Sequence, residues 1–520
     1  MFRYGGSQIE QEDAIETSLI YDEMQKRVNV TMKPTGAGWA SNANRFSFIA
    51  YLGWSPAAAL VNISQIPAFA IPVVAARYGY VKTSAIFAKT AADWMSGNTT
   101  LNTRENFKSF TREGNRNVSE DERRFIQLLT SRGDIDITRL GSITEEAHTD
   151  QRSPSAMPLG IQKALRTSAY MFHNAEMFNR EVTGLAAYRL IKKAKPELFK
   201  EGGKFYGDNM TENEEAIYEE VREMISESQF VYEAENRPRY MRESDIVKVA
   251  TQFKIYPQHV IMLYYQTMKE ALGKGRGEDA QFKREAIRKL TGLTVMGVIL
   301  GGLTGTALTV TLSAALEAIM TAVDPDDDEF EYRDLVRNGA DWFAEEYVPE
   351  EHQDFVKTFI SKGVVNAMGV DLHSRISQSE EMITRLGDKD FSSGRDFMAY
   401  LVLEWVAGAS GGLLSNIAYA VHDMDSPGLD NRLVSGTPVK AIKDVWKSAR
   451  YATDGIDTQA GAEVMNANEF NYFDIVIQMM GFTPNIVSEM YGKRNRLNDE
   501  KQQITDRVRR INNFFYQGML

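Results

Sequence analysis

The sequence LTGLTVMGVILGGLTGTALTVTLSAAL, residues 290–316, contains no charged side chain. Three of its glycines, Gly297, Gly301 and Gly305, are spaced four residues apart. If these 27 residues formed one helix, it would be about 40 Å long, which exceeds the roughly 30 Å apolar core of a bilayer. Glycines at this spacing lie on one helix face and let a second backbone come close. The stretch therefore predicts a tightly packed helix, either in a membrane or in a protein core.

Opposite charges flank this stretch. Basic residues precede it and acidic residues follow it, an order opposite to the one that the helix dipole favours. In a bacterial inner membrane the basic flank would stay cytoplasmic. One hypothesis is a helix that is stored buried and inserts later, and the other is a core helix. The flanking residues are Lys283, Arg284, Arg288 and Lys289 on one side and Asp324, Asp326, Asp327, Asp328, Glu329 and Glu331 on the other.

Two further stretches are rich in apolar residues. Residues 46–76 contain no charge but are interrupted by Pro56, Pro67 and Pro72, which predicts two or three short helices rather than one straight span. Residues 397–422 contain one acid and a flexible glycine-rich centre. A helix that is apolar all round is buried in a core or in a membrane. The interruptions favour the core for both stretches.

Composition sets broad limits on the class of protein. The chain has 520 residues and a net charge of −12, with 43% hydrophobic and 25% charged residues, which is an ordinary globular balance. It contains no cysteine, which excludes disulfides and thiolate metal sites. The acidic balance argues against extensive coating of nucleic acid. The first residues lack the apolar segment of a signal peptide, so export by the ordinary secretion route is not expected.

Most long segments show the helical spacing of apolar residues, and few show the alternation of strands. We therefore predict a mainly α protein, a large multi-helix bundle assembly with several apolar helices and little or no sheet. The predicted regions are an N-terminal helical region (1–118), a central helical domain (119–275), the glycine-spaced helix with an acidic linker and further helices (276–430), and a C-terminal helical tail (431–520).

Three short patterns resemble the motifs of metal-binding or catalytic sites. Glu145 and His148 form a single ExxH pair, whereas di-iron bundles use two. The acidic run that begins at Asp324 lacks the glycine and the final glutamate of a calcium loop. Residues 408–412 match GxSxG around Ser410, but that motif requires a strand–turn–helix elbow, and the surroundings read as apolar helix. We expect no catalytic residue, no metal and no cofactor, and predict that the chain is not an enzyme.

The stretch YEAENRPRYMRESDIVKVATQFKIYP, residues 232–257, resembles the PLxRF-type C-terminal region of large podovirus internal virion proteins. Residues 51–65, 176–188 and 481–489 contain shorter segments that look like the same region. Taken on its own, the Asn-Arg-Pro-Arg segment is a proline-fixed helix entry whose arginines contact either phosphate and acidic partners or local acids. The matching residues in the first stretch are Tyr232, Asn236, Arg237, Pro238, Arg239, Gln252, Phe253, Tyr256 and Pro257.

The resemblance implies a non-catalytic internal virion protein, or ejection protein, stored inside the capsid and moved into the host cell envelope with the genome. It implies a homo-oligomer, a ring or tube, that helps DNA cross the envelope. Its implied partners are other ejection proteins, the portal, the passing DNA and the host inner membrane. The alternatives are an accessory region of a virion enzyme, either a cell-wall lyase or an RNA polymerase, and an unrelated pore-forming protein.

Overall fold

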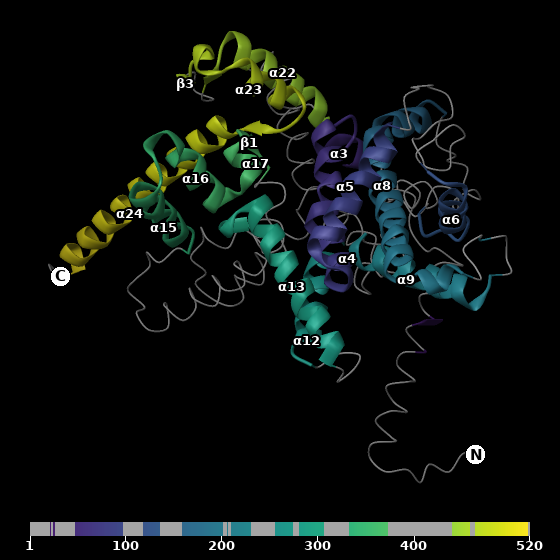
Figure 1. Cartoon of the computed structure of the whole chain (residues 1–520). Coiled ribbons are helices and arrows are strands. Elements are labelled where there is room, and N and C mark those ends of the chain that lie inside the picture. The colour runs from purple at the N-terminus through teal and green to yellow at the C-terminus, as the bar shows by residue number, and fades with distance from the viewer. Residues whose placement is uncertain are drawn as a thin grey trace, which may run out of the picture. The chain divides into compact units, whose positions relative to one another are not determined.

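The computed structural model is built almost entirely of helices (Figure 1). It describes residues 21, 24–25, 47–96, 118–135, 159–200, 205, 210–229, 255–273, 280–305, 332–372, 439–457 and 463–517. Within these ranges the only sheets are two antiparallel pairs of very short strands. The predicted fold class, mainly α with little sheet, is confirmed.

Contacts divide the chain into two units, each assembled from two separate stretches of sequence. Unit 1 comprises residues 1–296 and 380–441, and unit 2 comprises residues 297–379 and 442–520. Within unit 1, one apolar core includes residues from both sides of the predicted boundary at 118–119. The division of the chain into four consecutive regions, made from the sequence, stays a prediction.

Prolines shape the first helices of unit 1. Helix α3 (Pro56–Ile63) is followed without a loop by the π-helical turn η1 (Ile66–Ala70) and by α4 (Ile71–Tyr78). Proline cannot donate to the preceding turn, and a widened π turn accommodates the missing donor. The three segments agree with the predicted division at the prolines, but they are joined into one continuous helical run. After Gly79 the chain continues as α5 (Tyr80–Ser96).

The stretch Pro56–Tyr78 is, within the described ranges, the one helical run long and apolar enough to cross a membrane by length and composition. Of its most apolar window, 61% is buried inside the protein. Ile66, Ala70 and Val74 belong to the main core of unit 1. These residues pack in a core, as predicted for this stretch, and the helix of a core can pass the same length and composition test as a membrane span.

Capped helices complete this core. Ser119 and Glu122 form a capping box that starts α6 (Glu120–Ser131), and Thr211 and Glu214 form one that starts α9 (Glu212–Ser228). In the sequence, Ser119 followed by Glu122 and Thr211 followed by Glu214 both have the Ser/Thr-x-x-Glu spacing that predicts a helix start, and both starts are observed there. Between them lie the 36-residue helix α8 (Leu159–Ala194) and the 3₁₀ turn η2 (Pro196–Phe199).

The centre of the unit 1 core is aromatic. The rings of Phe125 and Tyr188 stack at 4.6 Å between centroids, and Phe205 packs edge-on against Phe125 at 4.9 Å. Tyr188 and Phe125 are fully buried. Because large rings bury the most apolar area, this contact between α6 and α8 contributes strongly to the stability of the unit.

Helix α12 (Ile255–Ala271) precedes α13 (Ala280–Gly301). The predicted single helix through residues 290–316 is wrong, because α13 ends at Gly301. Gly302 has a positive φ of +71°, and a 3₁₀ turn, η4 (Leu303–Gly305), follows. Gly305 therefore does not continue the helix face of Gly297 and Gly301. Residues 306–316 lie outside the described ranges, as does the apolar stretch 397–422.

Unit 2 combines short helices with two strand pairs. Helices α15 (Tyr332–Tyr347), α16 (Glu350–Lys362) and α17 (Val364–Ala367) lead to β1 (Val370–Asp371), which pairs with β4 (Thr483–Pro484). The remaining elements are α22 (Lys440–Thr453), β2 (Ile456–Asp457), β3 (Glu463–Met465), η6 (Ala467–Glu469), α23 (Tyr472–Met479) and α24 (Asn485–Gln517).

A small core joins these later elements. Tyr451 of α22 stacks on Phe470 with 4.5 Å between ring centroids, and Val487 of α24 packs in the same cluster. Only the first turns of α24 reach this core, because its later described residues are largely exposed.

Candidate functional site

Helix α8 buries an unusual number of polar side chains. They include Asn179 with 1% of its surface exposed and Glu181 with none. Burial of a polar or charged group without a partner costs several kcal/mol, roughly, so each needs a partner inside the protein. The buried polar residues of this helix, the α8 polar cluster, are Ser168, His173, Glu176, Asn179, Arg180, Glu181 and Thr183.

Partners of the α8 polar cluster come from distant parts of unit 1. The side-chain amide of Asn179 donates to the Asn62 backbone carbonyl at 2.7 Å. The indole N–H of Trp94 donates to a carboxylate oxygen of Glu181 at 2.8 Å. The guanidinium of Arg180 donates to the carbonyl of Asp134 at 3.2 Å. The cluster therefore fixes the register of α8 against α3, α5 and the end of α6.

A second charged group lies nearly two turns further along α8. Arg189 pairs with Glu122 and with Asp93, each at 2.7 Å, and all three side chains are at most 15% exposed. Burial alone would raise the pKa of Glu122, but hydrogen bonds from Arg189 and Ser119 outweigh it and hold this pKa below its usual value. Arg189, Asp93 and Glu122 thus join α5, α6 and α8 through buried charge.

His173 is the histidine of the α8 polar cluster. Burial lowers its pKa from 6.5 to about 4, so the imidazole is neutral at pH 7. In the unfolded chain His173 binds a proton at higher pH than in the folded protein. Its contribution to the free energy of unfolding is therefore fully present above pH 6.5 and is lost as the pH falls toward 4.

We expect the free energy of unfolding of unit 1 to fall by about 3 kcal/mol between pH 7 and pH 4 because of His173. Urea unfolding of the wild type and of His173→Leu, followed across this range, measures the effect. His352→Gln is the control, because that imidazole side chain is 65% exposed. Equal pH slopes in the wild type and His173→Leu would refute the expectation.

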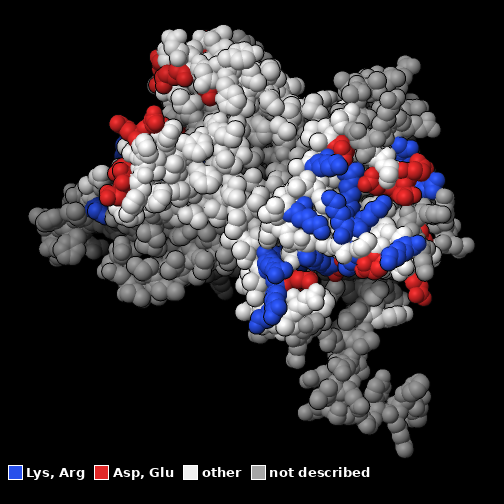
Figure 2. Space-filling view, viewed as in Figure 1, with Lys and Arg blue, Asp and Glu red and all other residues white. Residues whose placement is uncertain are grey.

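Lysine and arginine side chains gather on the face of unit 1 where α5 and α8 lie (Figure 2). Lys82 and Lys89 are exposed two turns apart on α5, and Lys192 and Lys193 are exposed at the end of α8. The lysines at a helix C-terminus also complement its dipole. The acidic chain therefore exposes four lysines on these two helices.

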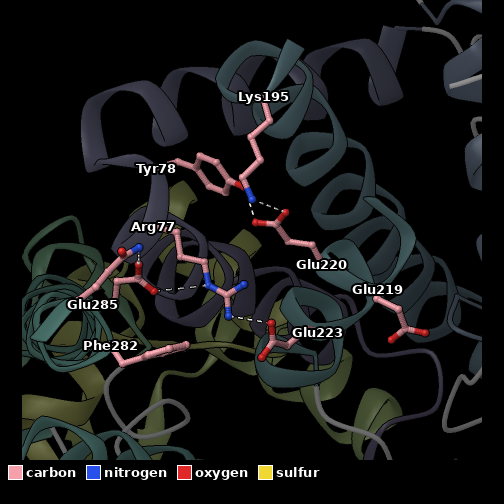
Figure 3. Close-up of a pocket in the computed structure, with 9 residues that line it drawn as sticks. Arg77, Tyr78, Lys195, Glu219, Glu220, Glu223, Phe282 and Glu285 are labelled. Atoms are coloured by element: carbon pink, nitrogen blue, oxygen red, sulfur yellow. Dashed lines mark hydrogen bonds and ion pairs between the residues drawn. The ribbon is translucent and has the colours of Figure 1, made fainter. Parts of the chain in front are cut away.

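An open pocket of about 840 Å³ is lined by residues of α4, α9 and α13 and by Lys195, the residue after α8 (Figure 3). Arg77 pairs with Glu223 at 2.8 Å, while Lys195 and the hydroxyl of Tyr78 donate to the two oxygens of Glu220 at 2.8 and 2.6 Å. Burial, and next the hydrogen bond to Glu220, raise the pKa of Tyr78. These side chains satisfy one another, so the pocket links α4, α8 and α9 and offers no activated nucleophile.

The glycines predicted to seat a second helix lie in two different elements. Gly297 and Gly301 belong to α13, and Gly305 to η4. A Cβ added at Gly301 would meet no heavy atom within 4 Å. Close backbone packing occurs at a neighbour instead, where a Cβ on Gly302 would clash with the Ser361 carbonyl.

Of the residues that resemble the virion region in the stretch 232–257, the structure describes two. Tyr256 is in the first turn of α12, and its ring meets that of Phe69 edge-on at 6.3 Å. Pro257 follows it in α12. The others, Tyr232, Asn236, Arg237, Pro238, Arg239, Gln252 and Phe253, lie outside the described ranges.

The shorter family-like segments are described, and two of them meet. Residues 51–65 contact the segment 176–188 where the side-chain amide of Asn179 donates to the Asn62 carbonyl at 2.7 Å. A further contact lies earlier in α8, where the backbone N–H of Trp54 donates to the Ser168 carbonyl at 2.9 Å. In unit 2, Phe482 of the segment 481–489 is buried and its N–H donates to the Ile477 carbonyl. The sequence pattern identifies these segments, but it does not predict the buried hydrogen bond between Asn62 and Asn179.

Among the described residues, no group of three or more histidine and acidic side chains is placed to hold a metal ion. The ExxH pair, the acidic run at 324–331 and Ser410 lie outside the described ranges. The fold defines a class, a mainly α protein of two units with polar side chains buried along a central helix. Comparison of the chain with protein-family models, with curated proteins and with solved structures finds no match.

Proposed function

We propose that the chain is an internal virion protein of a short-tailed phage. It is non-catalytic, and its copies form a ring or tube that helps genome DNA cross the host cell envelope. It is stored inside the capsid and moves to the envelope on ejection. Its partners are further copies, other ejection proteins, the portal, the passing DNA and the host inner membrane.

One observation carries the proposal. The segments 51–65 and 176–188 resemble the virion region independently, are more than a hundred positions apart in sequence, and contact each other through Asn62 and Asn179 in unit 1. If the whole region has the fold of the virion proteins, the segments that resemble them are expected to pack in one core. Chance resemblances in two distant segments would not be expected to contact each other.

Two further features support this proposal. The exposed lysines of α5 and α8 suit transient contact with a phosphate backbone, while the net charge of −12 limits tight binding. The apolar run Pro56–Tyr78 has the length for membrane contact once it leaves the core. A protein that is stored in a capsid with DNA and later reaches a membrane needs both of these features.

Purified particles of the encoding phage test the proposal. We expect an antibody against the chain to detect it in full particles, protected from added protease, and to find it lost from particles whose DNA has been released. The major capsid protein, which stays in both, is the control. Absence from full particles would overturn the proposal, and peptidoglycan cleavage or RNA synthesis by the purified chain would favour the enzyme alternative instead.

A further inference from the structure

The last helix of unit 2 exposes a row of large apolar residues. Early in α24, Val487 is buried with 1% exposure. Further along, Leu497, Ile504 and Val508 are 65%, 63% and 51% exposed. Three large apolar side chains in one row along a helix are costly to leave in water, and such rows mark interaction surfaces.

Their spacing is that of a coiled-coil seam. Leu497 and Ile504 are seven residues apart, and Val508 follows four residues later; the sequence continues the repeat at Ile511 and Phe515. In heptad terms, 497, 504 and 511 occupy position d, and 501, 508 and 515 occupy position a; residue 501 is a lysine, the one charged side chain among these six positions. A period of 3.5 residues keeps such a seam facing one partner helix.

The charges beside the seam identify the partner. Glu500 and Arg507 occupy successive g positions. In an antiparallel pair whose seam sets Leu497 opposite Val508, position 500 of one copy lies beside position 507 of the other, and the contact repeats by two-fold symmetry. A parallel pair would instead set these positions beside Thr505 and Asn512, where no ion pair forms.

We propose that residues 497–508 of α24 pair in antiparallel orientation with the same residues of a second copy of the chain. The inference specifies one contact within the homo-oligomer of the proposed function, on which it rests. Its tests read the pairing of α24 in solution, so they can fail while the chain is still found inside particles, and they can succeed for a protein that is not virion-borne.

The absence of cysteine from the chain permits a direct test of orientation. We expect Leu497→Cys and Val508→Cys, mixed and oxidised as full-length proteins, to give a disulfide-linked dimer on a non-reducing gel. Neither variant alone is expected to do so, because each cysteine would face an apolar residue of the other copy. Cross-linking by either variant alone, or none in the mixture, overturns the proposal.

A charge exchange tests the partner. Glu500→Arg and Arg507→Glu are each expected to raise the Kd of self-association about tenfold in sedimentation experiments, because two attractions become two repulsions. The double variant Glu500→Arg/Arg507→Glu is expected to restore the wild-type Kd. If the wild type does not self-associate, or if the double variant is weaker than both single ones, α24 does not pair with itself.

Discussion

Replacing Gly302 by alanine is expected to destabilise unit 2 by about 3 kcal/mol or more. Gly302 has a φ of +71°, which an L side chain rarely adopts, and a Cβ there would approach backbone atoms of Ser361 and Lys362 more closely than real Cβ atoms do. Backbone cannot rotate away as a side chain can, so the junction between η4 and α16 must open. Urea unfolding and amide hydrogen exchange of α16 measure the effect.

The neighbouring glycine is a matched control. Gly301→Ala adds the same methyl group one residue earlier, inside α13, where a Cβ meets no heavy atom within 4 Å. We expect unchanged stability or a gain of up to about 1 kcal/mol, because alanine favours helix over glycine. Equal losses at both positions would mean that the close approach of Gly302 does not hold the unit together.

This pair of glycines shows the limit of the sequence pattern at residues 290–316. The spacing of Gly297, Gly301 and Gly305 predicts a packed helix face, whereas the close backbone approach in this segment is made by Gly302, which does not belong to that spacing. Gly302 lies against the backbone of Ser361 and Lys362, and a Cβ added to the next residue, Gly363, would clash with the Leu300 carbonyl. No periodicity within 27 residues can report a backbone that arrives from 60 positions away.

Local signals predicted local structure well. The capping boxes at Ser119 and Thr211 place helix starts at the observed residues, because the side-chain oxygen satisfies amide groups of the same turn. The prolines at 56, 67 and 72 mark the segments of the first apolar run for an equally local reason. The mainly α fold follows from many such signals.

The α8 polar cluster could not be predicted in the same way. A polar residue in a helical pattern is usually assigned to the solvent face. Asn179 and Glu181 are buried because Asn62 and Trp94, from other helices, supply their hydrogen bonds. The one available signal was the run of polar residues within an otherwise apolar helix, which predicts partners without naming them.

Replacing Arg189 by methionine is expected to destabilise unit 1 by about 3 kcal/mol at pH 7. The change removes the partner of two carboxylates, Asp93 and Glu122, that are 15% and 13% exposed, and leaves both charges buried among α5, α6 and α8. Arg124→Met is the matched control: its partner Glu120 is 59% exposed, so the loss should be a few tenths of a kcal/mol, roughly.

The pH dependence separates lost charge from lost packing. Arg189 helps to hold the pKa of Glu122 below its usual value, so this stabilisation is present above the pKa of the unfolded chain and disappears as pH falls through that of the folded protein. The difference in unfolding free energy between wild type and Arg189→Met should therefore shrink on acidification below the ordinary carboxylate range. A difference that stays constant from neutral to acid pH would mean that the methylene stem of Arg189, packed on the core, matters more than its charge.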